Sequence, residues 1–529
     1  MNILRKIAAA AVASVVGLGG YAYAETPADT LVIAKTIDDM ITVDPAEVYE
    51  FSGGEVITNV YDRVMRFEAE DINTLVGGVV ESWVIGDDGK TYTFKMRSGQ
   101  TFHSGNPVTA EDVAWSLQRV VKLNKIPAFL ITQFGWTPEN VDGLVKALDD
   151  ETLEMTIPAG FAPSLVFNLL TSGVASVIDK KVALEHEVNG DMGYEWLKTN
   201  TAGSGPYSLK TWKANETLVF EANPDFRLGA PKLARVIVKH VPEPATQRLL
   251  LENGDVDIAR NLTADQVKGL EGAEGVTSNT YPSADTYYMA MSQKDERLAN
   301  PKVREAMRWL IDYQGMADTF LKGNFIVHQS FWPSGFFASY DENPFYLDVE
   351  KAKALLAEAG YPDGFEIQID TMNTSPFPEI AQSIQQTLAQ AGIKANIVQQ
   401  DGNQLFPLYR GRQHQIVLIY WSPDYMDPHS NADSFTRNPD NSDEPASKPL
   451  AWRNSWVIPE LTALSDAAVL EQDTEKRKAM YHDLQKQAQA DGPFVFLFQP
   501  TTQVALRSNL QGYVHGPTFD VIYYRLVTK

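Results

Sequence analysis

Apolar residues recur at helical spacing in several segments of the chain. In residues 348–360 four of them follow the i, i+3, i+4, i+7 spacing of one helix face, with Asp348 as a potential N-cap and Gly360 as a stop. A capping-box pattern of Thr109 and Asp112 opens another such segment. The spacing therefore predicts helices over 348–360, 109–121, 300–311 and from 473 through 484.

Short runs rich in β-branched and aromatic residues alternate with these helices. The runs predict strands over 31–34, 91–94, 217–220 and 236–238. The order is clearest between 365 and 399, where a strand (365–369) precedes a helix (378–391) and a second strand (394–398). A strand–helix–strand unit of about 35 residues has a right-handed crossover and parallel strands. The fold class is therefore α/β, with at least one open twisted sheet that we expect to be mainly parallel.

The first 24 residues have the three parts of a secretory signal. Arg5 and Lys6 precede an apolar run over 7–20, and Ala22-Tyr23-Ala24 forms a small-x-small site. The run is short for a hydrocarbon core of ~30 Å, and a retained anchor is the alternative. No later stretch approaches 18 uninterrupted apolar residues. We expect cleavage after Ala24 and a periplasmic protein that is not embedded in a membrane.

Composition excludes several classes of function. The 529 residues include 45 Lys and Arg against 68 Asp and Glu, a formal net charge of −23. Neutralising nucleic-acid phosphates needs clustered cations, so we expect no nucleic-acid partner. The chain has no cysteine, which excludes disulfides, thiolate nucleophiles, cysteine-bound zinc and a lipidated N-terminal cysteine.

Catalytic and metal-binding motifs are incomplete. His186-Glu187 begins like a zinc-protease helix, but position 190 is glycine, and Gly203-Ser204-Gly205 lacks the spacing of a nucleophile elbow. The acidic loop 440–444 lacks the glycine and glutamate spacing of a calcium loop. We expect no catalytic residue, no metal and no cofactor; a secreted hydrolase with scattered catalytic residues remains a remote alternative.

A series of short sequence motifs in a fixed order resembles a known protein family. The motifs are Asp88–Phe94, Phe102–Gly105, Val108–Val113, Gly203–Tyr207, Glu221–Phe226, Gly254–Asp257, Val303–Ala306, Asp348–Phe365, Trp421–Pro428 and the helix containing Arg477 and Tyr481. Together they resemble the family 5 (peptide/nickel type) substrate-binding proteins of ABC importers. The resemblance covers about residues 30 to 520.

The resemblance implies a two-lobed periplasmic binding protein (type II, cluster C-like) with mixed open sheets. It divides the chain into lobe I (25–50, 195–289 and 494–529), an extra subdomain of lobe I (51–194) and lobe II (290–493). Ligand is captured where the lobes close, and hinge positions absorb the dihedral change. The chain is expected to cross between the lobes at 288–292 and 491–494.

The resemblance also implies a ligand-binding loop. In peptide-binding members a carboxylate after a tryptophan holds the ligand's α-ammonium group, and the matching phrase here begins Tyr420-Trp421-Ser422 and reaches Asp424. The local sequence also supports a ligand-binding position for Asp424, because 416–419 is an apolar strand whose carboxyl end should lie where open α/β sheets bind ligands. Capping of the following turn is the alternative role for Asp424.

Further site residues follow from the same resemblance. The segment Tyr49-Glu50-Phe51 matches the first-lobe segment that faces the ligand backbone, and Glu50 is either a second cation contact or a solvated side chain. Dipeptide-selective members hold the ligand carboxylate with an arginine in the region that is 372–378 here, which contains none. Arg410 or Arg412 is a substitute candidate, or a surface charge.

Aromatic residues supply candidate pocket walls. Trp332, with Phe331 and Trp136, either lines the pocket or belongs to the core. The sequence thus predicts a monomeric periplasmic receptor that captures a short peptide or amino-bearing solute and delivers it to ABC permease and ATPase subunits. The alternative keeps the fold and transport role but changes the ligand to an opine-like compound, an oligosaccharide or a metal chelate.

Overall fold

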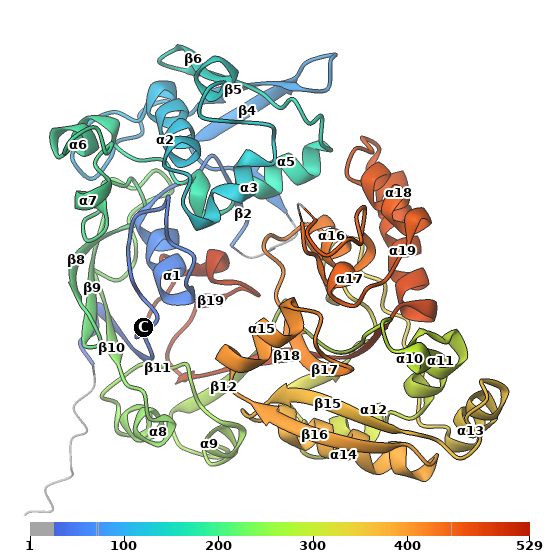
Figure 1. The fold of residues 1–529 in the computed structure, drawn as a ribbon. Helices are drawn as coiled ribbons and strands as arrows, with labels where there is room; N and C mark the ends of the chain where they lie inside the picture. The colour runs from blue at the N-terminus through green and yellow to red at the C-terminus, as the bar shows by residue number, and fades with distance from the viewer. Residues whose placement is uncertain (1–25, 70, 72–73, 446) are drawn as a thin grey trace, which may run out of the picture.

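The computed structural model describes residues 26–69, 71, 74–445 and 447–529. The expected signal segment, 1–24, lies outside the described residues. Figure 1 shows a first body around the strands β8 to β10, a smaller body above it, and a second large body that contains the orange and red helices.

A twelve-stranded sheet runs through both large bodies (Figure 1). Its main path has the order β16-β15-β17-β13-β18-β11-β1-β10-β9-β8, and β12 and β14 pair with β18 beside it. The strands are β1 (Thr30–Lys35), β8 (Tyr207–Lys213), β9 (Thr217–Ala222), β10 (Arg235–His240), β11 (Ile258–Ala259), β12 (Val276–Pro282), β13 (Thr286–Met291), β14 (Phe325–Val327), β15 (Glu366–Met372), β16 (Lys394–Gln400), β17 (Ile416–Trp421) and β18 (Phe494–Arg507).

The predicted strand–helix–strand unit is confirmed. β15 and β16 pair in parallel, and α14 (Phe377–Gln390) connects them. The expectation of a mainly parallel sheet is wrong, because β13 pairs antiparallel with both β17 and β18. β18 is 14 residues long and brings antiparallel neighbours into the middle of the sheet, which is consequently mixed.

Two extended segments connect the large bodies. The first part of β18 (Phe494–Phe498) pairs with β13, and its later part (Thr501–Arg507) pairs with β12. The crossings therefore lie at 283–285 and 499–500. The expected crossings at 288–292 and 491–494 fall within or beside the β13–β18 pairing of the second body, and the lobe boundaries stay a prediction.

The predicted helices begin at the expected caps. Thr109 and Asp112 form a complete capping box at α2 (Ala110–Leu123), and the side chain of Asp348 accepts the backbone N–H of Lys351 at the start of α13 (Val349–Glu358). The other helices of eight or more residues are α1 (Phe51–Val60), α8 (Pro244–Asn253), α11 (Pro301–Trp309), α15 (Gly402–Arg410), α16 (His429–Thr436), α18 (Pro459–Ala468) and α19 (Thr474–Asp491). Short helices are α3 (Phe129–Thr132), α4 (Val141–Leu144), α5 (Pro163–Leu169), α6 (Lys180–Glu185), α7 (Tyr194–Leu197), α9 (Ala264–Lys268), α10 (Glu296–Ala299), α12 (Tyr313–Asp318) and α17 (Leu450–Arg453).

The smaller body has its own sheet and core. Its strands, in the order β4-β5-β7-β6, are β4 (Val80–Ile85), β5 (Thr91–Met96), β7 (Thr152–Thr156) and β6 (Val145–Asp149). Apart from Ala46 and Val469, the buried residues of this core fall within 64–177. Helix α1 packs instead in the core of the first large body through Val56, Ile57 and Val60. The core is thus narrower than the expected subdomain, 51–194, whose boundaries stay a prediction. The first and second large bodies are called the first and second lobes below.

Candidate functional site

A cavity of about 210 Å³ lies where the three bodies meet. The first lobe contributes Tyr49 and Phe51, the smaller body contributes residues 168–172 in part, and the second lobe contributes the loop 422–426 that follows β17. The C-terminal segment adds Pro517, Thr518 and Asp520. The segments come from distant parts of the sequence, so only the folded chain forms this cavity.

Asp424 lies at this cavity because β17 ends beside it. The first four residues of β17 are buried, and the chain leaves the sheet after Trp421. The backbone N–H of Asp424 donates to the Ser430 hydroxyl at 2.9 Å, and its carboxylate accepts the hydroxyl of Tyr49 at 2.7 Å. The following turn is capped by Asp427, which accepts the backbone N–H of His429 at 2.9 Å. The Asp424 side chain is therefore directed to the first lobe.

The Asp424 carboxylate is partly buried and forms no ion pair with a Lys or Arg among the described residues. Burial raises its pKa, an effect that the Tyr49 hydrogen bond and the more distant charge of Arg453 partly offset. Burial, and then the charge of Asp424, raise the pKa of Tyr49 well above its usual value, so its hydroxyl remains a donor. A partly buried carboxylate without a cationic partner favours a positively charged ligand group.

A second carboxylate lines the same cavity. Asp285, in the first crossing segment, accepts the hydroxyl of Ser422 at 2.5 Å, and burial raises its pKa. The sequence analysis missed Asp285. A signal was present, because Ser283-Ala284-Asp285 interrupts an otherwise continuous extended run.

Four other predicted residues lie at the cavity. Tyr49, Phe51, Tyr420 and Ser422 all line it. The ring of Tyr420 stacks on Tyr287, with ring centroids 6.0 Å apart, which fixes the wall next to Asp424. The structure thus brings together the first-lobe and second-lobe segments that the resemblance implied.

Two predicted residues beside these do not line the cavity. The carboxylate of Glu50 accepts the backbone N–H of Tyr49 at 3.2 Å, so it is directed to its own segment. The indole N–H of Trp421 donates to Asn431 at 3.0 Å, and its ring packs against Phe435 in the second-lobe core. Trp421 points away from the cavity that Tyr420 lines, because successive side chains of a strand point to opposite faces.

The candidate aromatic pocket walls lie in cores, which is the alternative that the sequence left open. Trp332 is completely buried, and its indole N–H donates to the carbonyl of Phe337 at 2.8 Å. Phe331 is also completely buried, and Trp136 is buried in the smaller body, where it donates to the carbonyl of Thr156. These rings fill cores and cannot touch a ligand in the cavity.

The candidate arginines are also away from the cavity. Arg410, the last residue of α15, is exposed, and its guanidinium group lies over the ring of Phe406. Arg412 is buried and donates to Ser455 and Asn441. Neither lines the cavity, so the expectation of a carboxylate contact at Arg410 is not supported by the geometry.

The described residues contain neither a membrane-spanning helix nor a cluster of metal ligands. Over residues 26–69, 71, 74–445 and 447–529, none of the helices combines the length and the apolar character that crossing a membrane requires. Over the same residues, no three His, Asp or Glu side chains gather closely enough to bind a metal ion together.

Comparisons with known proteins agree on the family. The probable D,D-dipeptide-binding periplasmic protein DdpA of Escherichia coli is 30% identical over 507 residues, which cover 95% of this chain and 94% of that protein. HbpA2 of Haemophilus parasuis has a TM-score of 0.81 at 24% identity, covering 94% of this chain and 99% of that one. The ABC transporter-associated protein DppA of Helicobacter pylori, solved with the peptide STSA, has a TM-score of 0.73 at 24% identity, covering 94% and 98%.

Other matched proteins are named for glutathione, heme and a nickel–histidine complex. The sequence model of bacterial extracellular solute-binding proteins, family 5 Middle, matches residues 74–443. The mixed α/β periplasmic-binding-protein fold is shared with the solved relatives. The chain therefore belongs to family 5 of the bacterial extracellular solute-binding proteins, a non-enzymatic family that serves ABC importers.

Proposed function

We propose that the chain is a periplasmic receptor that captures a short peptide or another amino-bearing solute in the cavity at Asp424. The single observation that carries this proposal is the carboxylate of Asp424, which faces the cavity and, among the described side chains, accepts a hydrogen bond from the Tyr49 hydroxyl alone. An ammonium group there would form a charge-assisted hydrogen bond in a site largely shielded from water. Tyr420, Ser422 and Phe51 form the wall around it.

Capture requires that two lobes move relative to each other about the crossings at 283–285 and 499–500. Function then lies in the different ligand affinities of the two conformations, with no bond made or broken. Export to the periplasm with cleavage after Ala24, a monomeric state, and delivery to ABC permease and ATPase subunits complete the proposal. The periplasmic relatives support the compartment.

A non-peptide ligand is the second candidate. It is supported by the absence of arginine from 372–378 and by the relatives named for heme and a nickel–histidine complex. An opine-like compound, an oligosaccharide or a metal chelate would use the same cavity without a peptide carboxylate contact.

Isothermal titration calorimetry separates these ligands. The probes are alanine peptides of two to five residues in L and D forms, each free and N-acetylated. The proposal expects a free peptide to bind and its N-acetylated form to bind at least tenfold more weakly, because acetylation removes the ammonium charge. Equal affinity of the two forms would refute the role of Asp424, and no binding of any peptide would favour the second candidate.

A further inference from the structure

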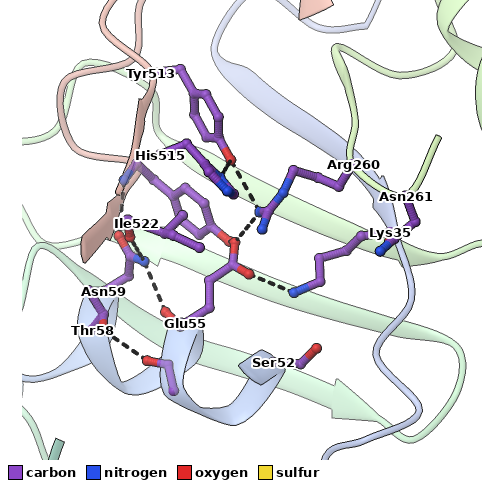
Figure 2. Close-up of polar contacts among 12 residues, drawn as sticks. Lys35, Ser52, Glu55, Thr58, Asn59, Arg260, Asn261, Tyr513, His515 and Ile522 are labelled. Atoms are coloured by element: carbon purple, nitrogen blue, oxygen red, sulfur yellow. Dashed lines mark hydrogen bonds and ion pairs between the residues drawn. The ribbon is translucent and has the colours of Figure 1, made fainter. Parts of the chain in front are cut away.

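Two cations share one carboxylate on the first lobe. The ammonium nitrogen of Lys35 lies 2.6 Å from Glu55 Oε2, and Nη1 of Arg260 lies 2.9 Å from Glu55 Oε1. Figure 2 shows the side chains of Lys35 and Arg260 both directed at the Glu55 carboxylate. Lys35 and Glu55 are buried, and the Arg260 side chain is only 11% exposed. This cluster therefore has one positive charge in excess.

The groups hydrogen-bonded to Glu55 and Arg260 add no negative charge to this cluster, although the charge of nearby Asp39 acts on Lys35. The hydroxyl of Tyr524 donates to Glu55, and Arg260 donates to the hydroxyl of Tyr513 at 3.1 Å. Burial alone would raise the pKa of Glu55, but Arg260 and Lys35 hold it well below its usual range, so Glu55 stays charged. Burial, and then the charge of Arg260, lower the pKa of His515 to about 3, so this ring is neutral at pH 7.

The cluster faces a second cavity, of about 390 Å³. Lys35, Arg260, Ser52 and Asn261 line it, together with Thr518. Figure 2 places the side chains of Lys35, Arg260 and Asn261 on one side of Glu55's helix, α1. An ammonium group has three donors, and Glu55 occupies one donor of Lys35 within the described chain. The remaining donors are available to an acceptor in the cavity.

Three further carboxylates line the second cavity. Asp39 accepts the backbone N–H of Ser52 at 2.9 Å, and Asp285 accepts the hydroxyl of Ser422. Asp38 is exposed at the edge of the cavity. These neutral donors orient Asp39 and Asp285 without cancelling their charge, so the positive excess belongs to the Lys35–Glu55–Arg260 cluster and not to the cavity lining as a whole.

The two cavities are adjacent and share part of their lining. Phe51, Asp285, Pro517 and Thr518 line both of them. Asp424 therefore lines one of two adjacent cavities and the Lys35–Arg260 pair lines the other. A solute with charges of opposite sign at its two ends matches this arrangement.

We propose that Lys35 and Arg260 form the subsite for the carboxylate end of the solute whose ammonium end binds Asp424. This inference rests on the proposed function. A carboxylate at the cluster would accept charge-assisted hydrogen bonds from both cations and balance the excess charge. Lys35 and Arg260 would thus make the carboxylate contact for which 372–378 contains no arginine. They make it from the opposite lobe.

The test uses one alanine peptide that the wild-type protein binds, as the free acid, the C-terminal amide and the N-acetyl form. Calorimetry is expected to show that amidation weakens binding tenfold or more (about the effect of losing a hydrogen bond to a charged group). In Arg260→Gln and Lys35→Met, the free acid should bind more weakly, and amidation should have little further effect. N-acetylation should weaken binding in every variant.

Controls keep the outcome decisive. Arg260→Lys preserves the charge and should retain part of the discrimination between acid and amide, whereas Arg235→Gln, at an exposed position of β10, should behave like the wild type. If amidation leaves the affinity of the wild type unchanged while acetylation lowers it, the subsite is refuted and the Asp424 proposal stands. If acetylation is harmless, the proposed function itself fails. The wild-type comparison decides the matter even where a variant does not fold.

Discussion

The hydroxyl of Tyr49 donates to Oδ1 of Asp424 at 2.7 Å, although 375 positions separate the two residues. Tyr49 precedes α1 in the first lobe, and Asp424 follows β17 in the second. The hydrogen bond therefore crosses the cleft in which we propose that ligand binds. A ligand ammonium group at Asp424 would lie next to this bond, so ligand recognition and contact between the lobes involve the same carboxylate.

Replacing Asp424 tests this relationship. Asp424→Asn keeps an oxygen that accepts the Tyr49 hydroxyl but removes the negative charge, so affinity for a bound free peptide should fall roughly 10- to 100-fold. Calorimetry measures the change. Asp87→Asn, at an exposed turn, is the matched control and should leave affinity unaltered. Wild-type affinity in Asp424→Asn would show that the carboxylate charge does not bind the ligand.

The pH dependence of binding gives a second prediction. Ammonium binding needs ionised Asp424, so affinity should be lost as pH falls through a pKa that burial raises above the usual value for Asp. Tyr49→Phe removes a hydrogen bond that lowers this pKa. The loss of affinity should therefore begin at a higher pH in Tyr49→Phe than in the wild type. Titrations between about pH 4.5 and pH 7 measure the shift; identical profiles would contradict the coupling.

Local patterns predicted much of the fold. The helix over 348–360 and the unit over 365–399 follow from periodicity and caps, because these interactions join residues close in sequence. The mixed sheet was not predictable in this way. Its central pairings join β13 to β18, about 200 residues later, and nothing local in either strand specifies its partner.

The same difference between local signals and long-range contacts applies to the candidate site. Asp424 was identified through the family resemblance, and the end of an apolar strand supported its position as a local signal. Its contact with Tyr49 was not predictable, since it depends on how distant segments meet. The role of Trp332 stayed open because the same ring type fills cores and lines pockets, and only packing distinguishes the two.

The placement of Trp332 leads to a third prediction. Trp332→Ala removes a completely buried ring, so the free energy of unfolding should fall by about 3–5 kcal/mol. Phe51→Ala is the comparison, because Phe51 is 65% exposed at the cavity and should affect affinity more than stability. Urea denaturation and calorimetry measure the two effects. A stable Trp332→Ala variant with impaired binding would reverse the assignment.

Arg477 and Asp427 lead to the last prediction. Arg477 donates two hydrogen bonds to Asp427, at 2.7 and 2.8 Å, both side chains are 1% exposed, and Nη1 of Arg477 also donates to Ser164 of the smaller body at 3.0 Å. Arg477→Met leaves the Asp427 charge buried without its partner, so the free energy of unfolding should fall by about 3–5 kcal/mol. Arg437→Met breaks a more exposed pair and should cost about 1 kcal/mol or less. Equal urea midpoints for the two variants would show that burial does not distinguish these ion pairs, since removing one partner is costly only where water cannot solvate the charge that remains.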